Sequence, residues 1–349
     1  MLDERSVRCL GVSVASGSAE KLQRALKSAE LLETSLHPFR SGGRIVFPVK
    51  APVPESILRE VEAVLVEEEF IERRRCPRSI REALSTVLPP ELLAELPSSY
   101  DIIGDIAVVH IPPTLEPYAS LIGEAIMRVN QSIKSVWGEA GAVEGIFRTR
   151  RLVHLTGENR TFTIHRENGC IFQVDLRKVY FTPRLSGERM RIASLTSKEE
   201  TVADMFAGVG PFSITIARHS RARVYAAEIN PDAYALLVEN IRLNKVEDRV
   251  TPLFGDSRMV LSERQVLADR IIMNYPSNPF GFLEAALKIL PGRGTIHLYG
   301  FTESLDKLRI EVLESLANMG ASGDVSVKKL RPVSPRKFLA AADIAVKSR

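Results

Sequence analysis

The clearest pattern in this chain begins near residue 198, where short apolar runs alternate with segments whose apolar residues recur every three or four positions. The runs predict strands, and the recurring positions predict amphipathic helices. Strands alternating with helices imply a mostly parallel sheet with helices on both faces. The expected strands are 201–205, 223–228, 250–254, 270–273 and 294–299, and the expected helices are 211–218, 231–244, 280–290 and 303–319.

The first seventy or so residues predict a small α+β domain. We expect an amphipathic helix in 19–32, a strand at 44–49, and a helix at 55–69, where apolar residues recur at helical spacing. A cluster of charges at 73–78 follows, and its proline, Pro77, cannot continue a helix. This cluster indicates a linker, so we place a domain boundary after residue 72.

The segment between these two parts, 73–197, predicts a mixed domain whose later half is a meander of short strands. Tight turns such as G-E-N-R and R-E-N-G separate the last of these strands. The expected elements are helices at 79–93 and 115–132, a strand pair around Gly104 and Asp105, and strands at 145–150, 161–165 and 170–175. The chain is therefore expected to have three domains: 1–72, 73–197 and 198–349.

Charge is concentrated in the middle segment. Residues 148–191 contain ten Arg and Lys residues against four Asp and Glu residues, a net charge of +6 in a chain whose total is +4. A basic segment in an almost neutral chain favours a polyanionic partner, because phosphates neutralised by Arg and Lys release counterions. On charge alone, a solvated basic face is an equally good interpretation.

The composition excludes several classes of protein. With 45% hydrophobic and 26% charged residues, the chain has the composition of a soluble globular protein. It has no run of about 20 apolar residues, and its start lacks the order of a signal peptide, so we expect a cytoplasmic protein with no membrane partner. Cys9, Cys76 and Cys170 are too far apart for a thiolate site, and the six histidines lack ligand spacing. We predict no metal.

The run D-M-F-A-G-V-G-P-F at 204–212 predicts a glycine turn between a strand and a helix, where backbone can approach a ligand. A dinucleotide fits poorly, because the third glycine of its fingerprint is replaced by Ser213 and Pro211 has no amide hydrogen. Asp204 would repel a diphosphate, whereas Glu228 is placed to accept ribose hydroxyls. These features favour S-adenosylmethionine, which has an amino group, a sulfonium and a ribose but no phosphate.

The ends of the next strands complete the predicted cofactor site. Asp256 follows the third strand and is placed for the adenine amino group, and Asn274 opens an Asn-Tyr-Pro-Ser turn after the fourth. Such a turn presents an amide and rigid carbonyls above the sulfonium, and indicates a nucleobase substrate. The candidate cofactor-binding residues are Asp204, Phe206, Gly208, Gly210, Glu228, Ile229, Asn230, Asp256 and Asn274.

With these motifs, the chain resembles the archaeal and eukaryotic tRNA (guanine-37-N1)-methyltransferase family over nearly its whole length. The matching segments are S-Y-D-I-I-G-D-I-A-V at 99–108, F-R-T-R-R at 147–151, L-T-G-E-N-R-T-F-T-I-H-R-E-N-G at 155–169, V-Y-F-T-P-R-L-S-G-E-R-M-R-I-A at 179–193, the glycine turn and the Asn-x-Pro turn. The resemblance implies a class I Rossmann-fold methyltransferase domain, its mostly parallel sheet ending in an antiparallel strand. Before it come a small α+β domain that docks on the outer corner of tRNA and a β-rich RNA-binding middle domain. It also implies methyl transfer to N1 of guanosine 37, next to the anticodon.

Roles for individual residues also come from this resemblance. It implies that Glu188 is the general base, that Arg148 faces the guanine O6, and that Asn274 and Pro276 hold the target base. The positions expected to shape the site or to contact the RNA are Tyr180, Arg184 and Arg189. The family usually has N-L-P-P at the turn, so Tyr275 and Ser277 change the predicted base pocket. Paired last strands are expected at 331–346. Basic residues in and just before them either contact phosphates or form a solvated edge: Lys328, Lys329, Arg331, Arg336 and Lys337.

Three other functions fit parts of the sequence. A wyosine-pathway enzyme on the same fold would transfer an aminocarboxypropyl group, or would also methylate the tricyclic wyosine precursor; Glu188 and Arg148 favour methyl transfer to guanine instead. A non-catalytic tRNA-binding protein would not need the acids and glycines of the cofactor site. An adenine-directed amino-methyltransferase rests on the Asn-Tyr-Pro-Ser turn alone. We expect a monomeric enzyme that binds the anticodon loop of tRNA.

Overall fold

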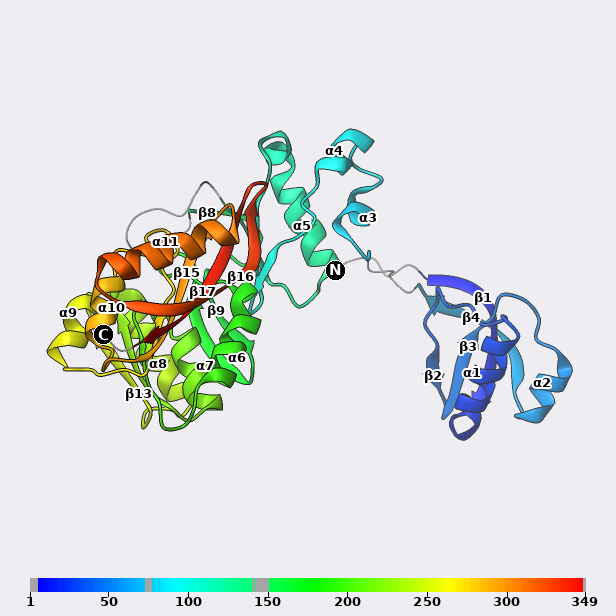
Figure 1. Cartoon of the computed structure of the whole chain (residues 1–349). Coiled ribbons are helices and arrows are strands. Elements are labelled where there is room, and N and C mark those ends of the chain that lie inside the picture. The colour runs from blue at the N-terminus through cyan, green and yellow to red at the C-terminus, as the bar shows by residue number, and fades with distance from the viewer. Residues whose placement is uncertain (1–5, 73–76, 140, 142–150, 348–349) are drawn as a thin grey trace. The chain divides into compact units, whose positions relative to one another are not determined.

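The computed structural model describes residues 6–72, 77–139, 141 and 151–347. The chain forms two compact units, 1–78 and 79–349, which are drawn together in Figure 1. Within the described residues, no helix is long and apolar enough to cross a membrane. The same residues contain no group of three or more His, Cys, Asp or Glu side chains that could hold a metal ion.

The first unit is a four-stranded antiparallel sheet in the order β2-β3-β1-β4, packed against helix α1. Its elements are β1 (Ser6–Ala15), a 3-10 turn (Ser16–Ser18), α1 (Ala19–Ser28), β2 (Phe39–Ser41), β3 (Arg44–Pro48), α2 (Glu55–Glu60) and β4 (Val64–Ile71). The core forms where Val12 and Val14 of β1 meet Leu22 and Leu26 of α1.

The helix predicted at 55–69 is wrong in its second half. Helix α2 ends at Glu60, and β4 then pairs with β1 over eight residues. The apolar residues Val64, Leu65 and Val66 fit a strand as well as a helix, and pairing with a strand more than fifty residues away decides between the two. Strand β1 itself was not predicted.

The second unit begins with short helices and a four-stranded sheet in the order β5-β6-β7-β8. The helix predicted at 79–93 is wrong as a single element: α3 (Ile80–Leu84) and α4 (Pro90–Glu95) are separated at Pro89 and Pro90, which stop helix α3 from continuing. The elements that follow are β5 (Asp101–Ile103), β6 (Ile106–Val109), a 3-10 turn (Pro113–Tyr118), α5 (Ala119–Val129), β7 (Ser135–Glu139), β8 (Leu152–Gly157), β9 (Phe162–Glu167) and β10 (Cys170–Asp175). The strand predicted at 145–150 lies outside the described residues.

The predicted α/β pattern after residue 198 is confirmed as a seven-stranded sheet in the order β13-β12-β11-β14-β15-β17-β16, in which β17 runs antiparallel to β15. Its elements are a 3-10 turn (Pro183–Leu185), α6 (Ser186–Leu195), β11 (Thr201–Asp204), α7 (Pro211–His219), β12 (Arg223–Glu228), α8 (Pro231–Leu243), β13 (Val250–Phe254), α9 (Ser257–Glu263), β14 (Arg270–Met273), α10 (Leu283–Lys288), β15 (Gly294–Thr302), α11 (Leu305–Asn318), β16 (Ser322–Ser334) and β17 (Lys337–Lys347). Helices α6, α7 and α8 contribute to the core on one face, and α9, α10 and α11 to the core on the other (Figure 1).

The core beneath α6, α7 and α8 also includes side chains from the middle segment, such as Ile103 and Phe172. Strand β10 is attached to α8 by side-chain amides. Asn240 exchanges two hydrogen bonds with the backbone of Gln173, of 2.7 and 3.1 Å, and Asn244 exchanges two with Ile171, of 2.9 and 2.6 Å. Residues 79–349 therefore form one compact unit. The domain boundary that we placed between residues 197 and 198 stays a prediction.

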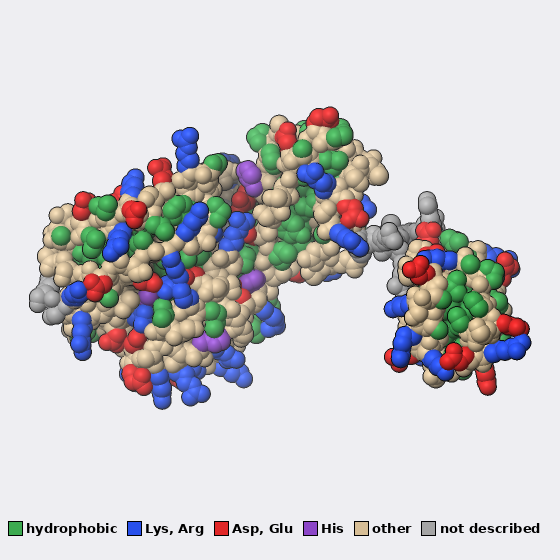
Figure 2. All heavy atoms as spheres, turned by 45° about the vertical axis from the view of Figure 1, so that its right-hand side comes forward, with side chains coloured by type: hydrophobic (Ala, Val, Ile, Leu, Met, Phe, Trp, Pro, Cys, Tyr) green, Lys and Arg blue, Asp and Glu red, His purple; other side chains and the backbone are tan. Residues whose placement is uncertain are grey.

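Residues 148–191 present less unpaired positive charge than their sequence indicates. Among the described residues of this segment, five pair with carboxylates: Arg160 with Asp105 and Glu158, Lys178 with Asp232, Arg184 with Asp101, Arg189 with Glu167, and Arg191 with Glu188 and Asp343. Figure 2 shows basic and acidic side chains interspersed on the visible face of this unit. Much of the positive charge of this segment is thus neutralised by carboxylates of the same protein.

Candidate active site

The glycine turn after β11 shapes one wall of a pocket. Gly210 has a φ of +93°, a left-handed conformation that favours glycine, and it caps the start of α7. A side chain there would also meet Leu237 and Ile214 at 2.7 and 2.8 Å. Pro211 occupies the first turn of α7, where a missing amide hydrogen costs nothing. The turn therefore has the conformation that the sequence predicted.

Glu228, at the end of β12, faces the pocket in a fixed orientation. Its two carboxylate oxygens accept backbone hydrogen bonds of 2.7 Å, one from Gly208 and one from Asn230. Burial raises the pKa of Glu228, and these backbone bonds counteract that rise. Asn230 in turn caps α8 and donates to the carbonyl of Lys178 at 2.9 Å. The remaining lone pairs of the carboxylate can accept two hydroxyl groups.

The pocket brings together nine of the predicted site residues: Tyr180, Arg189, Phe206, Gly208, Glu228, Ile229, Asn230, Asn274 and Pro276. Five others do not line it: Arg184, Glu188, Asp204, Gly210 and Asp256. Arg148, expected at the guanine O6, lies outside the described residues.

Asp204 is buried beneath the turn. Its carboxylate accepts from the hydroxyl of Ser213 at 2.7 Å and from the amide of Phe206 at 3.3 Å. Burial, together with the charge of Glu228, raises the pKa of Asp204 to about 6, while the Ser213 hydrogen bond acts in the opposite direction. In this position Asp204 supports the glycine turn from below.

Asp256 and Arg184 are both held by ion pairs. Asp256 caps α9 through the amide of Arg258 and also accepts from its guanidinium at 2.5 Å, which lowers the pKa of Asp256. Arg184 donates to Asp101 at 2.5 Å. The expected contact of Asp256 with adenine and that of Arg184 with RNA stay predictions.

Arg189 is the buried cation of the pocket wall, with 2% of its surface exposed. Its Nη1 pairs with Glu167 at 2.5 Å and its Nη2 donates to the carbonyl of Thr182 at 2.7 Å, but its Nε–H has no hydrogen-bond partner among the described residues. The Nε–H of Arg331, another residue of the wall, is also buried, without a partner in the part of the chain that the structure describes. Both arginines line the pocket, so their positive charge suits an anionic part of a ligand.

Tyr275, where the resemblance implies a leucine, belongs to an aromatic group at the Asn-x-Pro turn. Its ring stacks on Phe206 with a centroid distance of 5.0 Å, and Phe282 meets Phe206 edge-on at 4.8 Å. Tyr275 and Phe206 both line the pocket. The substitution thus adds a flat apolar surface to the wall beside Asn274.

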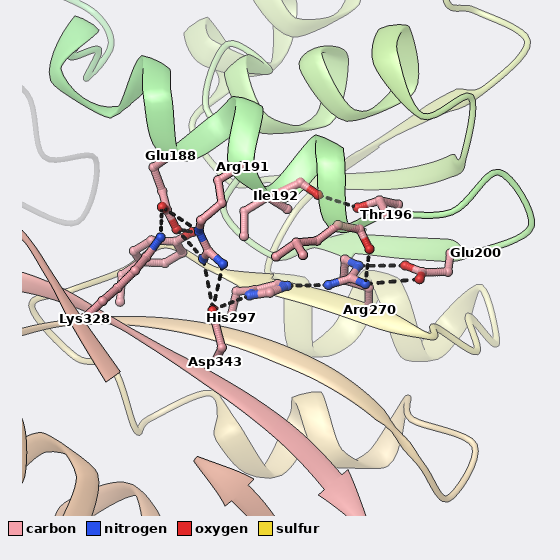
Figure 3. A network of polar contacts seen from close by, with 11 residues as sticks. Glu188, Arg191, Ile192, Thr196, Glu200, Arg270, His297, Lys328 and Asp343 are labelled. Atoms are coloured by element: carbon pink, nitrogen blue, oxygen red, sulfur yellow. Dashed lines mark hydrogen bonds and ion pairs between the residues drawn. The ribbon is translucent and has the colours of Figure 1, made fainter. Parts of the chain in front are cut away.

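Glu188 lies on α6 in a polar network, with 7% of its surface exposed (Figure 3). It accepts from the hydroxyl of Tyr299 at 2.9 Å, from Arg191 at 2.7 and 2.9 Å, and from Lys328. Burial raises the pKa of Glu188, but the hydrogen bonds from Arg191 and Lys328 outweigh it, so the pKa lies below its ordinary value. The carboxylate is therefore ionised at neutral pH.

The network continues from Arg191 away from Glu188. Arg191 donates to Asp343 at 2.7 and 3.0 Å, and Asp343 contacts Nδ1 of His297 at 2.6 Å. Arg270 lies 2.6 Å from the other ring nitrogen of His297. Because an arginine only donates, this nitrogen accepts and Nδ1–H donates to Asp343, which defines a neutral imidazole. Burial lowers the pKa of His297, in agreement with that state. None of these contacts was predicted.

The chain is similar to known proteins in both sequence and structure. Residues 163–327 match the TRM5/TYW2 methyltransferase domain, and residues 80–161 match the TYW2 N-terminal domain. The tRNA (guanine(37)-N(1))-methyltransferase Trm5b of Pyrococcus abyssi is 43% identical over 97% of this chain and 99% of its own length. A tRNA(Phe) (4-demethylwyosine(37)-C(7)) aminocarboxypropyltransferase of Pyrococcus horikoshii is 36% identical over 74% of this chain and 91% of its own.

Among solved structures, the complex of aTrm5 with tRNALeu superposes with a TM-score of 0.80 at 34% identity, covering 97% of this chain and all of the other. The similarity to these relatives, in sequence and in structure, thus extends over nearly the whole chain and includes the first unit. This chain belongs to the TRM5/TYW2 methyltransferase family.

Proposed function

We propose that the protein transfers the methyl group of S-adenosylmethionine to N1 of guanosine 37 in tRNA. The observation that carries this proposal is the 43% identity to a tRNA (guanine(37)-N(1))-methyltransferase over 97% of the chain. A partial match could reflect the cofactor domain alone, whereas this one includes the first unit and the middle segment. The tRNA-bound relative supports tRNA as the partner.

The pocket suits S-adenosylmethionine part by part. Glu228 can accept the two ribose hydroxyls, and the positive charges of Arg189 and Arg331, which line the pocket, can attract the carboxylate of the methionine moiety. Pro211 removes an amide that a diphosphate would use. The bound cofactor would supply an electrophilic methyl group, and the residues around it would orient the acceptor.

The acceptor chemistry requires a base and an anion-stabilising group. Neutral guanine carries a proton on N1, so N1 becomes a nucleophile only when that proton leaves and charge builds on O6. We assign proton removal to Glu188, stabilisation of O6 to Arg148, and positioning of the base to Asn274 and Pro276. Reaching N1 also requires the base to leave the stack of the anticodon loop. The ring of Tyr275, which stacks on Phe206, would narrow the site that holds the target base.

Methyl transfer to an unmodified tRNA transcript, followed by identification of the modified nucleoside, tests the proposal. The expected product is 1-methylguanosine, and a transcript with adenosine at position 37 should remain unmodified. Equal methylation of the adenosine transcript would contradict the assignment, and no transfer to any transcript would support a non-catalytic tRNA-binding protein.

A second candidate is the wyosine-pathway activity, favoured by the 36% identity to an aminocarboxypropyltransferase. That match leaves about a quarter of this chain uncovered, whereas the methyltransferase match does not. Mass spectrometry of the product nucleoside separates the two, because an aminocarboxypropyl group is much heavier than a methyl group.

The three-domain division leads to a separate prediction. We propose that residues 1–72 dock on the outer corner of tRNA while 73–197 and 198–349 form the active site. Deleting 1–72 should weaken tRNA affinity and leave the single-turnover rate at saturating tRNA nearly unchanged, because the compact unit 79–349 remains whole. Binding assays and rapid-quench kinetics measure the two effects. Loss of methyl transfer at saturating tRNA would contradict the division.

A further inference from the structure

The wall of the pocket and the network around Glu188 are neighbouring rows on one face of the sheet. In the first row, Phe301, Leu339 and Arg331 are cross-strand partners on β15, β17 and β16, and all three line the pocket. The next row is formed by Tyr299, Ala341 and Lys328. Tyr299 and Lys328 both bind Glu188. Successive residues on one face of a strand lie about 7 Å apart. The strand residues that bind Glu188 are therefore one row along the sheet from the residues that line the pocket.

A β-bulge makes this arrangement possible. The register of β16 against β17 shifts between Lys329 and Arg331, which leaves Leu330 as the extra residue. In a regular strand, residues 328 and 331 would face opposite sides of the sheet. The bulge turns both cations to the same side, so Arg331 reaches the pocket and Lys328 reaches Glu188.

The carboxylate of Glu188 is fully occupied. Oε1 accepts from Tyr299 and from Nη2 of Arg191, and Oε2 accepts from Nε of Arg191 and from Lys328 (Figure 3). A carboxylate offers about four acceptor sites, and all four are used here. While every donor stays in place, Glu188 cannot accept a proton from a substrate.

Only one of these donors is free to move. Tyr299 is fully buried, and Arg191 is held by two hydrogen bonds to Asp343. Lys328 has 34% of its side chain exposed, and it makes no other hydrogen bond or ion pair within the residues that the structure describes. Its long, unbranched side chain can swing out to solvent with little disturbance to the sheet.

We propose that Lys328 is a positioning residue that occupies the proton-accepting site of Glu188 in the tRNA-free protein and leaves it when the target guanine enters. The inference rests on the proposed function, in which Glu188 is the base. Leaving exposes a lone pair of Oε2 to the N1–H of guanine, and the lysine ammonium becomes available to the RNA.

The charges around Glu188 show what this exchange does. Arg191 from α6, Tyr299 from β15 and Lys328 from β16 contact the carboxylate. Asp343 from β17 pairs with Arg191, and His297 from β15 pairs with Asp343, so neither contacts Glu188 directly. The burial of Glu188 raises its pKa, and the two cations together lower it below the ordinary value. Departure of one cation raises the pKa and makes the carboxylate a stronger base, while Arg191 still keeps it ionised at neutral pH.

The test is Lys328→Met in the full chain, with single-turnover methyl transfer to unmodified transcript measured between pH 5 and pH 8. The ratio of variant rate to parent rate cancels titrations common to both proteins. At limiting tRNA this ratio should fall by about fivefold from pH 8 to pH 5, because the variant's Glu188 becomes protonated at a higher pH. At saturating tRNA and pH 8 the two rates should agree within about threefold, since Lys328 has left Glu188 in the bound parent.

Lys329→Met is the matched control, because Lys329 lies over the Phe338 ring at 4.7 Å and carries the same charge. Its ratio should stay flat with pH, and Lys328→Arg should restore a flat ratio. A flat ratio for Lys328→Met would overturn the proposal, as would a loss above about tenfold at saturating tRNA and pH 8, which would place Lys328 in the bound reaction.

Two further variants distinguish the proposal from an unstable Lys328→Met protein and from a wrong assignment of the base. If Lys328→Met melts early, Lys328→Gln removes the same charge and must give the same pH dependence. Glu188→Gln separates the two failures: a large loss in this variant together with a flat Lys328→Met ratio removes only the role of Lys328. A parent-like rate in Glu188→Gln removes the base assignment and the role of Lys328 with it.

Discussion

Glu188→Gln is expected to lower the single-turnover rate of methyl transfer by about 10²–10⁴-fold at neutral pH, the usual contribution of a general base. Glutamine keeps the size of the side chain and one acceptor for Tyr299, but it cannot take the proton from guanine N1. Binding of tRNA should remain nearly intact, because Glu188 is buried and paired with protein cations. Rapid-quench kinetics with saturating tRNA and cofactor measure the loss.

The loss of rate in Glu188→Gln should also change with pH in a defined direction. The loss should shrink as the pH rises, because guanine N1 then loses its proton without help from the enzyme. Stability should also fall at neutral pH: the lowered pKa of folded Glu188 means that its contribution is present above the unfolded value and is lost as the pH falls through the folded value. A rate equal to the parent's at neutral pH would remove Glu188 from the role of base.

Glu200→Gln is the matched control for this experiment. Glu200 pairs with Arg270 at 2.6 Å, at the far end of the polar network from Glu188 (Figure 3). The variant removes one carboxylate from the same set of ion pairs, so it should lower the melting temperature without a comparable change in rate. A similar loss of rate in both variants would indicate that the network acts through stability alone.

Glu228→Ala is expected to weaken S-adenosylmethionine binding by about 100-fold, measured by calorimetry without tRNA. Two charge-assisted hydrogen bonds to ribose hydroxyls contribute about 1.5 kcal/mol each at the lower end of their range. Loss of the carboxylate also removes the acceptors for the amides of Gly208 and Asn230, which loosens the glycine turn. The effect should therefore appear in cofactor affinity before it appears in the methyl-transfer step.

A control for cofactor binding lies on the next helix. Glu239→Ala removes a carboxylate that is half exposed and paired with Arg242 on the same face of α8. Its cofactor affinity should equal that of the parent. An unchanged affinity in Glu228→Ala would contradict the assignment of Glu228 to the ribose.

Sequence patterns were sufficient where local signals bound each element. Strands β12, β13 and β14 begin and end at their predicted residues, because polar or turn residues flank short apolar runs. Turns after parallel strands must meet at one sheet edge, which explains why Gly208, Glu228 and Asn274 could be placed in one pocket. In the first unit, by contrast, the strand at 64–71 is stabilised by its partner β1, a contact that no local pattern reveals.

The surroundings of Glu188 could not be predicted for a similar reason. Its partners Tyr299 and Lys328 are 111 and 140 residues away in sequence, and the bulge at Leu330 decides which way Lys328 faces. A period-two reading of β16 assigns Arg331 to the wrong side of the sheet. The charge count over 148–191 overestimates the exposed positive charge, because acids outside this segment also take part: Asp101 pairs with Arg184, and Asp343 pairs with Arg191.

The attachment of β10 to α8 has a consequence for the rigidity of the pocket beside Glu228. Asn240 and Asn244 act in place of a neighbouring strand, and a slip of β10 by one residue would break all four of their backbone hydrogen bonds. The β9–β10 hairpin and the cofactor pocket therefore keep a constant separation. The hairpin and the pocket thus behave as parts of one rigid body, and a displacement of one is transmitted to the other through α8.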